Sequence, residues 1–239
     1  MRATIGILVG LALLSGVARR ADAAAPVDVS ECGPIVKPGA YRLVRDLSSG
    51  GDCLVIKADR VMIDLAGFRI IGKGKGRAIS GDASEVSIQN GTVTGFGDGI
   101  ALRGQALIER VRVAGNLQRG IAVTEMAVVK DSSISQNGEG IRVGAHSVLM
   151  GNTVSDNLES GIISSRVSTI IGNTVSGNGL SGVAALADST VIDNVVSRNA
   201  GYGLGVVCPS NVIGNVSSEN GRNVVLDRPG CNMVSNATE

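Results

Sequence analysis

Three charged residues in this sequence stand at a spacing that could support chemistry. Asp98, Arg119 and Glu139 each come directly before a glycine that is followed by isoleucine. If the chain repeats with that spacing, the three side chains stack in one row. The arginine could then neutralise a sugar carboxylate while Asp98 or Glu139 works as general acid or base. The row is equally typical of a surface ladder of ion pairs, which we favour because such pairs are common and weak.

A second set of basic residues lies just beyond glycine–isoleucine pairs of this kind. Arg103, Arg142 and Arg166 could line one side of the molecule and bind an anionic chain such as a polyuronate. A long apolar sheet also needs charge for solubility, and we favour that simpler interpretation for these arginines.

No residue pattern indicates a cofactor or a metal. His146 has no neighbouring carboxylate in the sequence to orient it as a general base, so we interpret it as a turn residue. Asp82 and Glu85 could ligate calcium, but two separated carboxylates without a rigid loop make a weak site. The cysteines do not have the spacing of a zinc site.

The positions of glycine and asparagine show what must hold these residues in place. A glycine followed by a branched apolar residue recurs at Gly99, Gly120, Gly140, Gly161, Gly182 and Gly203. Asparagines recur 21 residues apart at Asn152, Asn173, Asn194, Asn215 and Asn236, and we place Asp131 and Arg110 in the same column further back. A third series runs through Asn116, Asn137, Asn157, Asn178, Asn199 and Asn220.

Short apolar stretches separate these markers, and none has the length or the helix formers of an amphipathic helix. A rung of this kind cannot bury its apolar side chains alone, so the rungs must stack into parallel sheets. Asparagine tolerates the left-handed backbone of a turn and can bond the same amide on the next rung. We therefore predict an all-β fold, a single-stranded right-handed parallel β-helix with about 21 residues per rung. A left-handed hexapeptide helix would repeat every 18 residues or so, and the leucine-rich-repeat signature is missing.

The two ends of the chain differ from its repeats. Residues 1–23 resemble a secretory signal, with Arg2 before an apolar run and Ala21-Asp22-Ala23 as a cleavage site. Residues 24–52 are expected to form an N-terminal cap, and residues 53–239 the β-helix. The signal predicts a secreted or periplasmic protein that does not span a membrane once the signal is removed.

Four cysteines fit an oxidising compartment. The simplest pairing joins Cys32 to Cys53 and Cys208 to Cys231, one disulfide near each end, although four cysteines allow three connectivities. The net charge is only +1, so nothing in the composition favours a nucleic-acid partner.

The glycine–isoleucine and Asn-x-Val series resemble the pectin-lyase-like superfamily. Within it they are similar to the short repeats of nitrous-oxide-maturation periplasmic proteins and mannuronan epimerases, and the segment Asp64–Ile70 also resembles a common early rung. The resemblance covers residues 32–239 and implies the fold more than an activity. No catalytic cluster of the superfamily transfers residue by residue: the Tyr-Gly-Phe-Asp-Pro-His cluster of alginate epimerases is missing.

These observations favour a binding or structural protein over an enzyme, and leave catalysis undecided. We expect a secreted or periplasmic β-helix that recognises a polysaccharide or cell-surface partner along one sheet face. The alternative is a polysaccharide lyase or C5-epimerase acting on an anionic polyuronate, with Asp98, Arg119 and Glu139 as its catalytic candidates.

Overall fold

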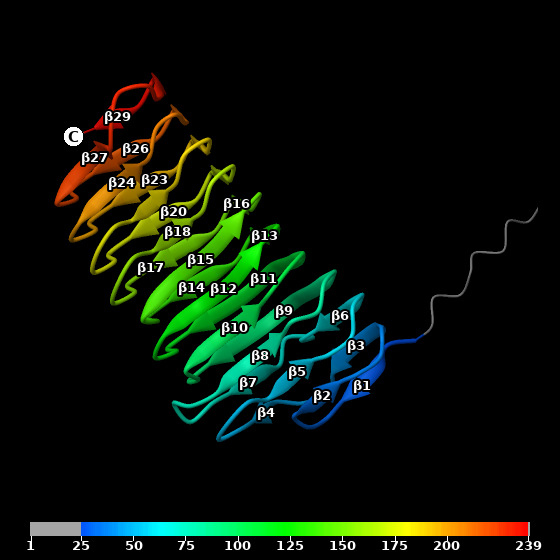
Figure 1. The fold of residues 1–239 in the computed structure, drawn as a ribbon. Helices are drawn as coiled ribbons and strands as arrows, with labels where there is room; N and C mark the ends of the chain where they lie inside the picture. Colours follow the sequence, from blue (N-terminus) through cyan, green and yellow to red (C-terminus); the bar gives the residue numbers. More distant parts are fainter. Residues whose placement is uncertain (1–24, 239) are drawn as a thin grey trace, which may run out of the picture.

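The chain winds into an elongated solenoid whose rungs stack from residue 25 to the C-terminal end (Figure 1). This computed structural model describes residues 25–238, so the predicted signal at residues 1–23 lies outside the described residues. Every secondary-structure element between residues 25 and 238 is a strand, and every strand pair is parallel. The described residues form no helix that could cross a membrane.

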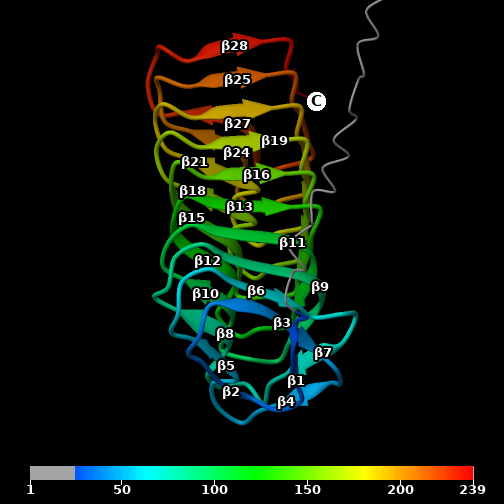
Figure 2. The same ribbon diagram turned by 90° about the vertical axis from the view of Figure 1, so that its right-hand side faces the viewer.

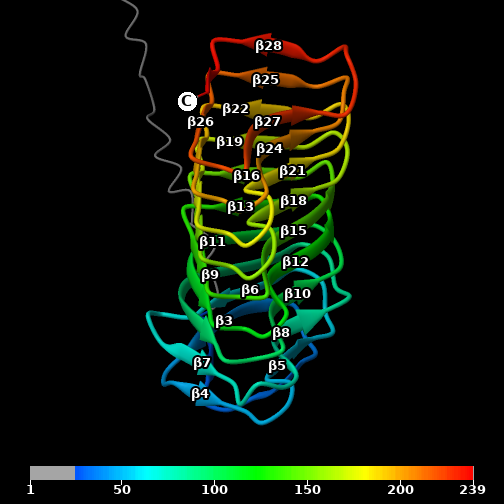
Figure 3. The same cartoon turned by 90° about the vertical axis from the view of Figure 1, so that its left-hand side faces the viewer.

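One side of the solenoid is a ten-stranded parallel sheet, visible on the right in Figure 3. Its strands are β2 (Gly33–Ile35), β5 (Leu54–Ile56), β8 (Arg77–Gly81), β10 (Asp98–Leu102), β12 (Arg119–Glu125), β15 (Glu139–Ala145), β18 (Ile162–Ser164), β21 (Val183–Ala185), β24 (Tyr202–Val206) and β27 (Arg222–Leu226). Each strand pairs with its counterpart one rung later, so equivalent residues form columns across the sheet.

The rest of the wall is a nineteen-stranded sheet that bends around a corner, and we call its two parts the first and second arms. The first arm, which Figure 2 shows from outside, holds β1 (Val27–Val29), β3 (Gly39–Leu43), β6 (Val61–Asp64), β13 (Ala127–Lys130), β16 (Val148–Met150), β19 (Thr169–Ile171), β22 (Thr190–Ile192), β25 (Asn211–Ile213) and β28 (Asn232–Val234). The second arm holds β4 (Leu47–Ser48), β7 (Arg69–Ile71), β14 (Ser133–Ser135), β17 (Thr153–Ser155), β20 (Thr174–Ser176), β23 (Val195–Ser197), β26 (Val216–Ser218) and β29 (Ala237–Thr238). Two long strands, β9 (Val86–Thr94) and β11 (Ala106–Ala114), run through the corner and join the arms.

Branched apolar side chains fill the interior in columns, one member per rung. The column beside the rung glycines is fully buried and consists of Ile79, Ile100, Ile121, Ile141, Ile162, Val183 and Leu204. Each member packs on a similar side chain above and below, so the core extends along the whole stack. The parallel β-helix predicted from the repeat is confirmed.

Two asparagine ladders stitch the turns together. In the ladder from Asn152 to Asn236, each side-chain oxygen from Asn173 onward accepts hydrogen bonds from the backbone N–H and the amide nitrogen of the asparagine one rung earlier. The series from Asn116 to Asn220 does the same at the next turn. The predicted ladder is confirmed, and its members up to Asn215 are buried scaffold residues.

The placement of Arg110 and Asp131 in the first ladder is wrong. Ser133 pairs with Thr153, and the backbone N–H of Ser132 donates to the side-chain oxygen of Asn152. This rung is one residue shorter than the next, so counting back by 21 slips one position. Asp131 and Arg110 both have φ of +51° and occupy the left-handed turn that precedes the ladder.

Both predicted disulfides are present, one near each end. Cys32 bonds Cys53 across 21 residues and Cys208 bonds Cys231 across 23, so each joins one rung to the next. The Cα atoms are 4.5 and 5.0 Å apart, within the ordinary range for a disulfide. The cap boundary at residue 52 stays a prediction, and residues Val27–Ser48 already supply strands β1–β4 to the sheets.

Ser164 on β18 is a buried hydroxyl with no hydrogen-bond partner among the described residues. It stands in a core column between Val143 and Ala185. Since an unpaired buried hydroxyl destabilises a fold, Ser164→Ala should raise the free energy of unfolding by about 1 kcal/mol in a urea titration. Ser147→Ala is the matched control, because Ser147 is equally buried and donates to Gly144 at 2.9 Å, so this change should lower stability. Equal losses in both variants would show that the Ser164 hydroxyl has a partner.

Candidate functional site

A long groove crosses the outer face of the ten-stranded sheet. Its volume is about 1340 Å³, and its lining extends from Val55 on β5 to Val225 on β27. The groove therefore runs along the solenoid axis and crosses many successive rungs. It is the natural place on this chain for an extended ligand.

Small residues make the floor of this groove. The second residue after each rung glycine points outward, and at several rungs it is alanine or glycine: Ala101, Ala122, Ala184 and Gly205. Side chains of this size leave the centre of the sheet face low. Larger residues on either side then stand above it and form the rims.

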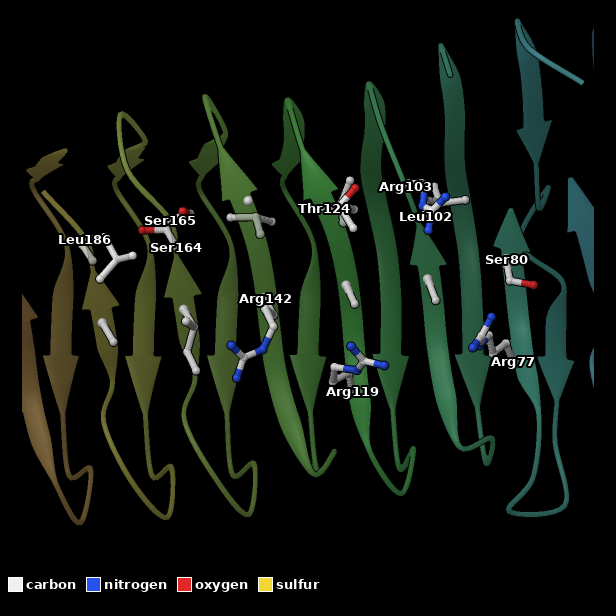
Figure 4. A pocket seen from close by; sticks show the side chains of 18 of the residues that line it. Arg77, Ser80, Leu102, Arg103, Arg119, Thr124, Arg142, Ser164, Ser165 and Leu186 are labelled. Atoms are coloured by element: carbon white, nitrogen blue, oxygen red, sulfur yellow. The ribbon is translucent and has the colours of Figure 1, made fainter. Parts of the chain in front are cut away.

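The two rims carry different residues, as Figure 4 shows. We call one the arginine rim, formed by Arg77, Arg119, Arg142, Ser181 and Tyr202. The opposite rim is formed by Asp82, Arg103, Thr124, Ser165, Leu186 and Val207. The arginine rim is built mainly on the residues that directly precede the rung glycines, so stacking converts their sequence spacing into a row.

Buried carboxylates hold the arginines in place. Both oxygens of Asp98 accept hydrogen bonds from Arg119, from Nε and from Nη2, at 3.0 Å each. Arg77 approaches the same carboxylate at 3.8 Å. The Asp98 side chain is only 5% exposed, whereas that of Arg119 is 40% exposed and faces the groove. The hydrogen bond to Asp98 raises the pKa of Arg119, so this guanidinium stays charged.

Glu139 holds Arg142 in the same manner one rung later. The Nε of Arg142 donates to Glu139 at 2.8 Å and its Nη2 donates to the other oxygen, while the carboxylate is 5% exposed. Both acids therefore have both oxygens bonded to an arginine. A bidentate pair of this kind fixes the orientation of the guanidinium plane and leaves its remaining N–H groups free to bind a ligand.

The structure brings most of the predicted residues together. Asp98, Arg119 and Glu139 do stack in one row, and the side chain of Arg142, which stands in the floor column beside Ala122, reaches that row through Glu139. Arg103 lies on the opposite rim, 3.6 Å from the exposed carboxylate of Asp82. The remaining three candidates of the sequence, Arg166, His146 and Glu85, lie on the turns that follow strands of the ten-stranded sheet.

Arg166 pairs with Asp188 at 2.6 Å and does not line the groove. His146 is exposed with φ of +58°, in the turn where sequence reasoning placed it. Between residues 25 and 238 no cluster of three or more His, Cys, Asp or Glu side chains is arranged to hold a metal.

Sequence reasoning missed Arg77 and the alanine floor. Arg77 is in register with Asp98, but it is followed by alanine and not by the glycine that marks this position in the later rungs, so the sequence pattern did not identify it. The signal for the floor was present, because alanine recurs two residues after Gly99, Gly120 and Gly182. Recognising a groove from those alanines requires knowing that this column points outward.

The comparisons with known proteins agree with the fold. The family model described as "Right handed beta helix region" matches residues 77–222. No curated protein sequence matches the chain.

Solved structures similar to this chain include two epimerases and a tailspike. The A-module of the Azotobacter vinelandii mannuronan C-5 epimerase AlgE6 is 15% identical, with a TM-score of 0.58 over 86% of this chain and 89% of that one. The periplasmic alginate epimerase AlgG is 13% identical, with a TM-score of 0.57 over 83% and 72%. The Dettilon tailspike protein is 17% identical, with a TM-score of 0.70 over 89% of this chain and 53% of that one. At these identities the likeness establishes a shared fold.

Proposed function

We propose that this chain, which belongs to the right-handed β-helix family, binds an extended acidic polysaccharide along the groove of its ten-stranded sheet. The observation that carries the proposal is the arginine rim, where buried Asp98 and Glu139 hold Arg119 and Arg142 toward an open groove. Guanidinium groups suit the planar, bidentate recognition of carboxylates.

The repeat of the rungs supports a polymeric ligand. Neighbouring strands lie about 4.8 Å apart, so a chain laid along the groove meets a new rung at each such step. One rung, that of Asp98, lies between the rungs of Arg77 and Arg119, and Arg142 lies on the rung after that of Arg119. Carboxylates placed along an extended saccharide could therefore contact successive arginines.

Two further observations are consistent with this assignment. Two of the similar structures are named as mannuronan or alginate epimerases, whose polymers are acidic polysaccharides. The two disulfides favour an oxidising compartment outside the cytoplasm. We propose that residues 1–23 direct export and that the exported chain meets its polysaccharide there.

Asp98 and Glu139 support binding more than catalysis. In a lyase or epimerase one of them would exchange a proton with the sugar. Here each carboxylate has both oxygens bonded to an arginine, so it would have to leave that partner first. We therefore assign these two acids to the positioning of Arg119 and Arg142.

A titration of the full chain tests the proposal. Polygalacturonate and alginate should both bind, and their affinity should fall as salt is raised, because exposed charges are screened. Dextran, a neutral polymer, should not bind. The same mixtures are followed by ultraviolet absorbance for an unsaturated product and by NMR for epimerised sugar residues. Either product would show that the chain is a polysaccharide lyase or a C5-epimerase.

Arg77 and Arg103 are the best residues for a binding variant, because both are exposed and neither has a bidentate partner. The double variant Arg77→Ala and Arg103→Ala should keep the fold and weaken polygalacturonate binding by about tenfold. Arg112→Ala on β11 is the matched control, since Arg112 is exposed on the second arm. If that control weakens binding as much as the double variant does, the binding surface is not the groove.

A further inference from the structure

The groove changes its chemistry along its length. The part formed by β8, β10, β12 and β15 is lined by Arg77, Arg103, Arg119 and Arg142, with Asp82 at its edge. Among the described residues, the lining from β18, β21 and β24 and the turns beside them carries no charge; it consists of Ile163, Ser164, Ser165, Ser181, Ala184, Ala185, Leu186, Tyr202, Gly205, Val206 and Val207. Beyond these two parts, the lining also includes Asp52, Lys57 and Asp59 at the β5 end and Asp227 at the β27 end. We call the two parts between these ends the charged half and the apolar half.

Large apolar side chains border the apolar half while still open to water. Leu186 on one rim is 46% exposed and Tyr202 on the other is 42% exposed. Ile163 and Ala184 are half-buried on the floor between them. An apolar group of a ligand that covered these side chains would remove their apolar surface from water, and this would stabilise the complex.

Gly205, which has no side chain, leaves the floor open at the end of the apolar half. A Cβ at Gly205 would lie 3.5 Å from Cδ2 of Tyr202, so the tyrosine ring rests beside the open floor at that position. The apolar half is therefore bounded by this ring, by Ala184 on the floor and by Leu186 on the other rim. It continues directly from the charged half at Arg142. The continuity means that one ligand can contact both halves.

We propose that the ligand of this groove is an acidic glycolipid, whose sugar carboxylate lies on the charged half and whose aliphatic chain lies on the apolar half. The proposal rests on the proposed function for the charged half and adds the apolar substituent. Charge complementarity assigns the head to Arg77, Arg119 and Arg142. The aliphatic tail is assigned to the apolar half between Leu186 and Tyr202, because the lining there is uncharged.

Three small probes separate the contributions of head and tail. Octyl glucuronide carries both, octyl glucoside carries only the tail, and glucuronate carries only the head. In calorimetric titrations of the full chain, below the micelle concentration of each detergent, octyl glucuronide should bind at least tenfold more tightly than either of the others. Equal affinity for octyl glucuronide and glucuronate would overturn the inference, as would a failure of octyl glucuronide to bind at millimolar concentration.

Ala184→Glu tests where the tail lies. The residue points outward on β21, so a glutamate there should leave the fold intact and place a charge in the apolar half. Octyl glucuronide should then bind at least tenfold more weakly, while the affinity for glucuronate, which carries only the head, stays within twofold. Thr174→Glu adds the same charge on the exposed second arm and should change neither affinity.

The outcomes distinguish this inference from the proposed function. If polygalacturonate binds in the groove but Ala184→Glu leaves octyl glucuronide affinity unchanged, the acidic-polysaccharide proposal stands and the glycolipid inference is wrong. If octyl glucoside binds as tightly as octyl glucuronide and polygalacturonate does not bind, the proposed function fails and with it the acidic head.

Discussion

Asn173→Ala should lower the free energy of unfolding by about 3 to 4 kcal/mol, a loss that is large for a single polar residue. The side-chain oxygen of Asn173 accepts from the backbone N–H and the amide of Asn152, each at 3.0 Å. Its own amide donates to the carbonyl of Leu149 at 3.0 Å and to Asn194 at 2.9 Å. Alanine would leave these buried partners unsatisfied on both neighbouring rungs, which is why the loss exceeds that of one hydrogen bond.

Urea denaturation of the purified chain with its disulfides intact measures this loss. Asn211→Ala is the matched control, because Asn211 is exposed on β25 and its side-chain oxygen accepts a hydrogen bond from the exposed amide of Asn232. The control should stay within about 0.5 kcal/mol of the parent chain. A loss at Asn173 no larger than this would show that the ladder does not stabilise the stack.

Gly140→Ala should be nearly as damaging, with a loss of about 3 kcal/mol, at the upper end of the range for overpacking. A Cβ at Gly140 would lie 2.3 Å from the carbonyl oxygen of Gly161 and 2.7 Å from Cγ1 of Val154. It would also press on the ladder amide of Asn157 at 3.0 Å. The backbone must shift to relieve these contacts, and Glu139, the adjacent residue, would move with it.

Gly172→Ala is the control for this change. Gly172 has φ of +63°, but a Cβ there would meet nothing within 4 Å, so alanine should cost only about 1 kcal/mol of backbone strain. Thermal and urea unfolding of both variants make the comparison. Polygalacturonate titration should show weaker binding for Gly140→Ala alone, because Glu139 positions Arg142 at the groove. Equal stability losses in the two variants would contradict the close stacking of the glycine column.

The candidate site was predictable where it follows the repeat. Asp98, Arg119 and Glu139 share one position in their rungs, and stacking at a common period must place them in a row. Arg77 was not predictable in this way because its rung lacks the glycine that marks the position. Arg166 was placed with Arg103 and Arg142, but its rung carries it into the turn, where Asp188 pairs with it. Arg166 stands five residues after its rung glycine, whereas Arg142 stands two and Arg103 four residues after theirs, so the three arginines do not share a position in the rung.

The sequence by itself determined the solenoid, because a period of 21 residues with asparagine, glycine and branched apolar residues at constant places has one way to bury its apolar side chains. It also predicted the two disulfides as the simplest of three possible pairings, since a spacing near one rung brings two cysteines together, and the structure confirms that pairing. Only the tertiary structure decided which columns face outward and which acids are buried beneath which arginines. Those choices depend on how the chain turns at each corner, where a rung of 20 residues and one of 21 stack in the same register, so a fixed count of 21 residues does not identify every stacked position.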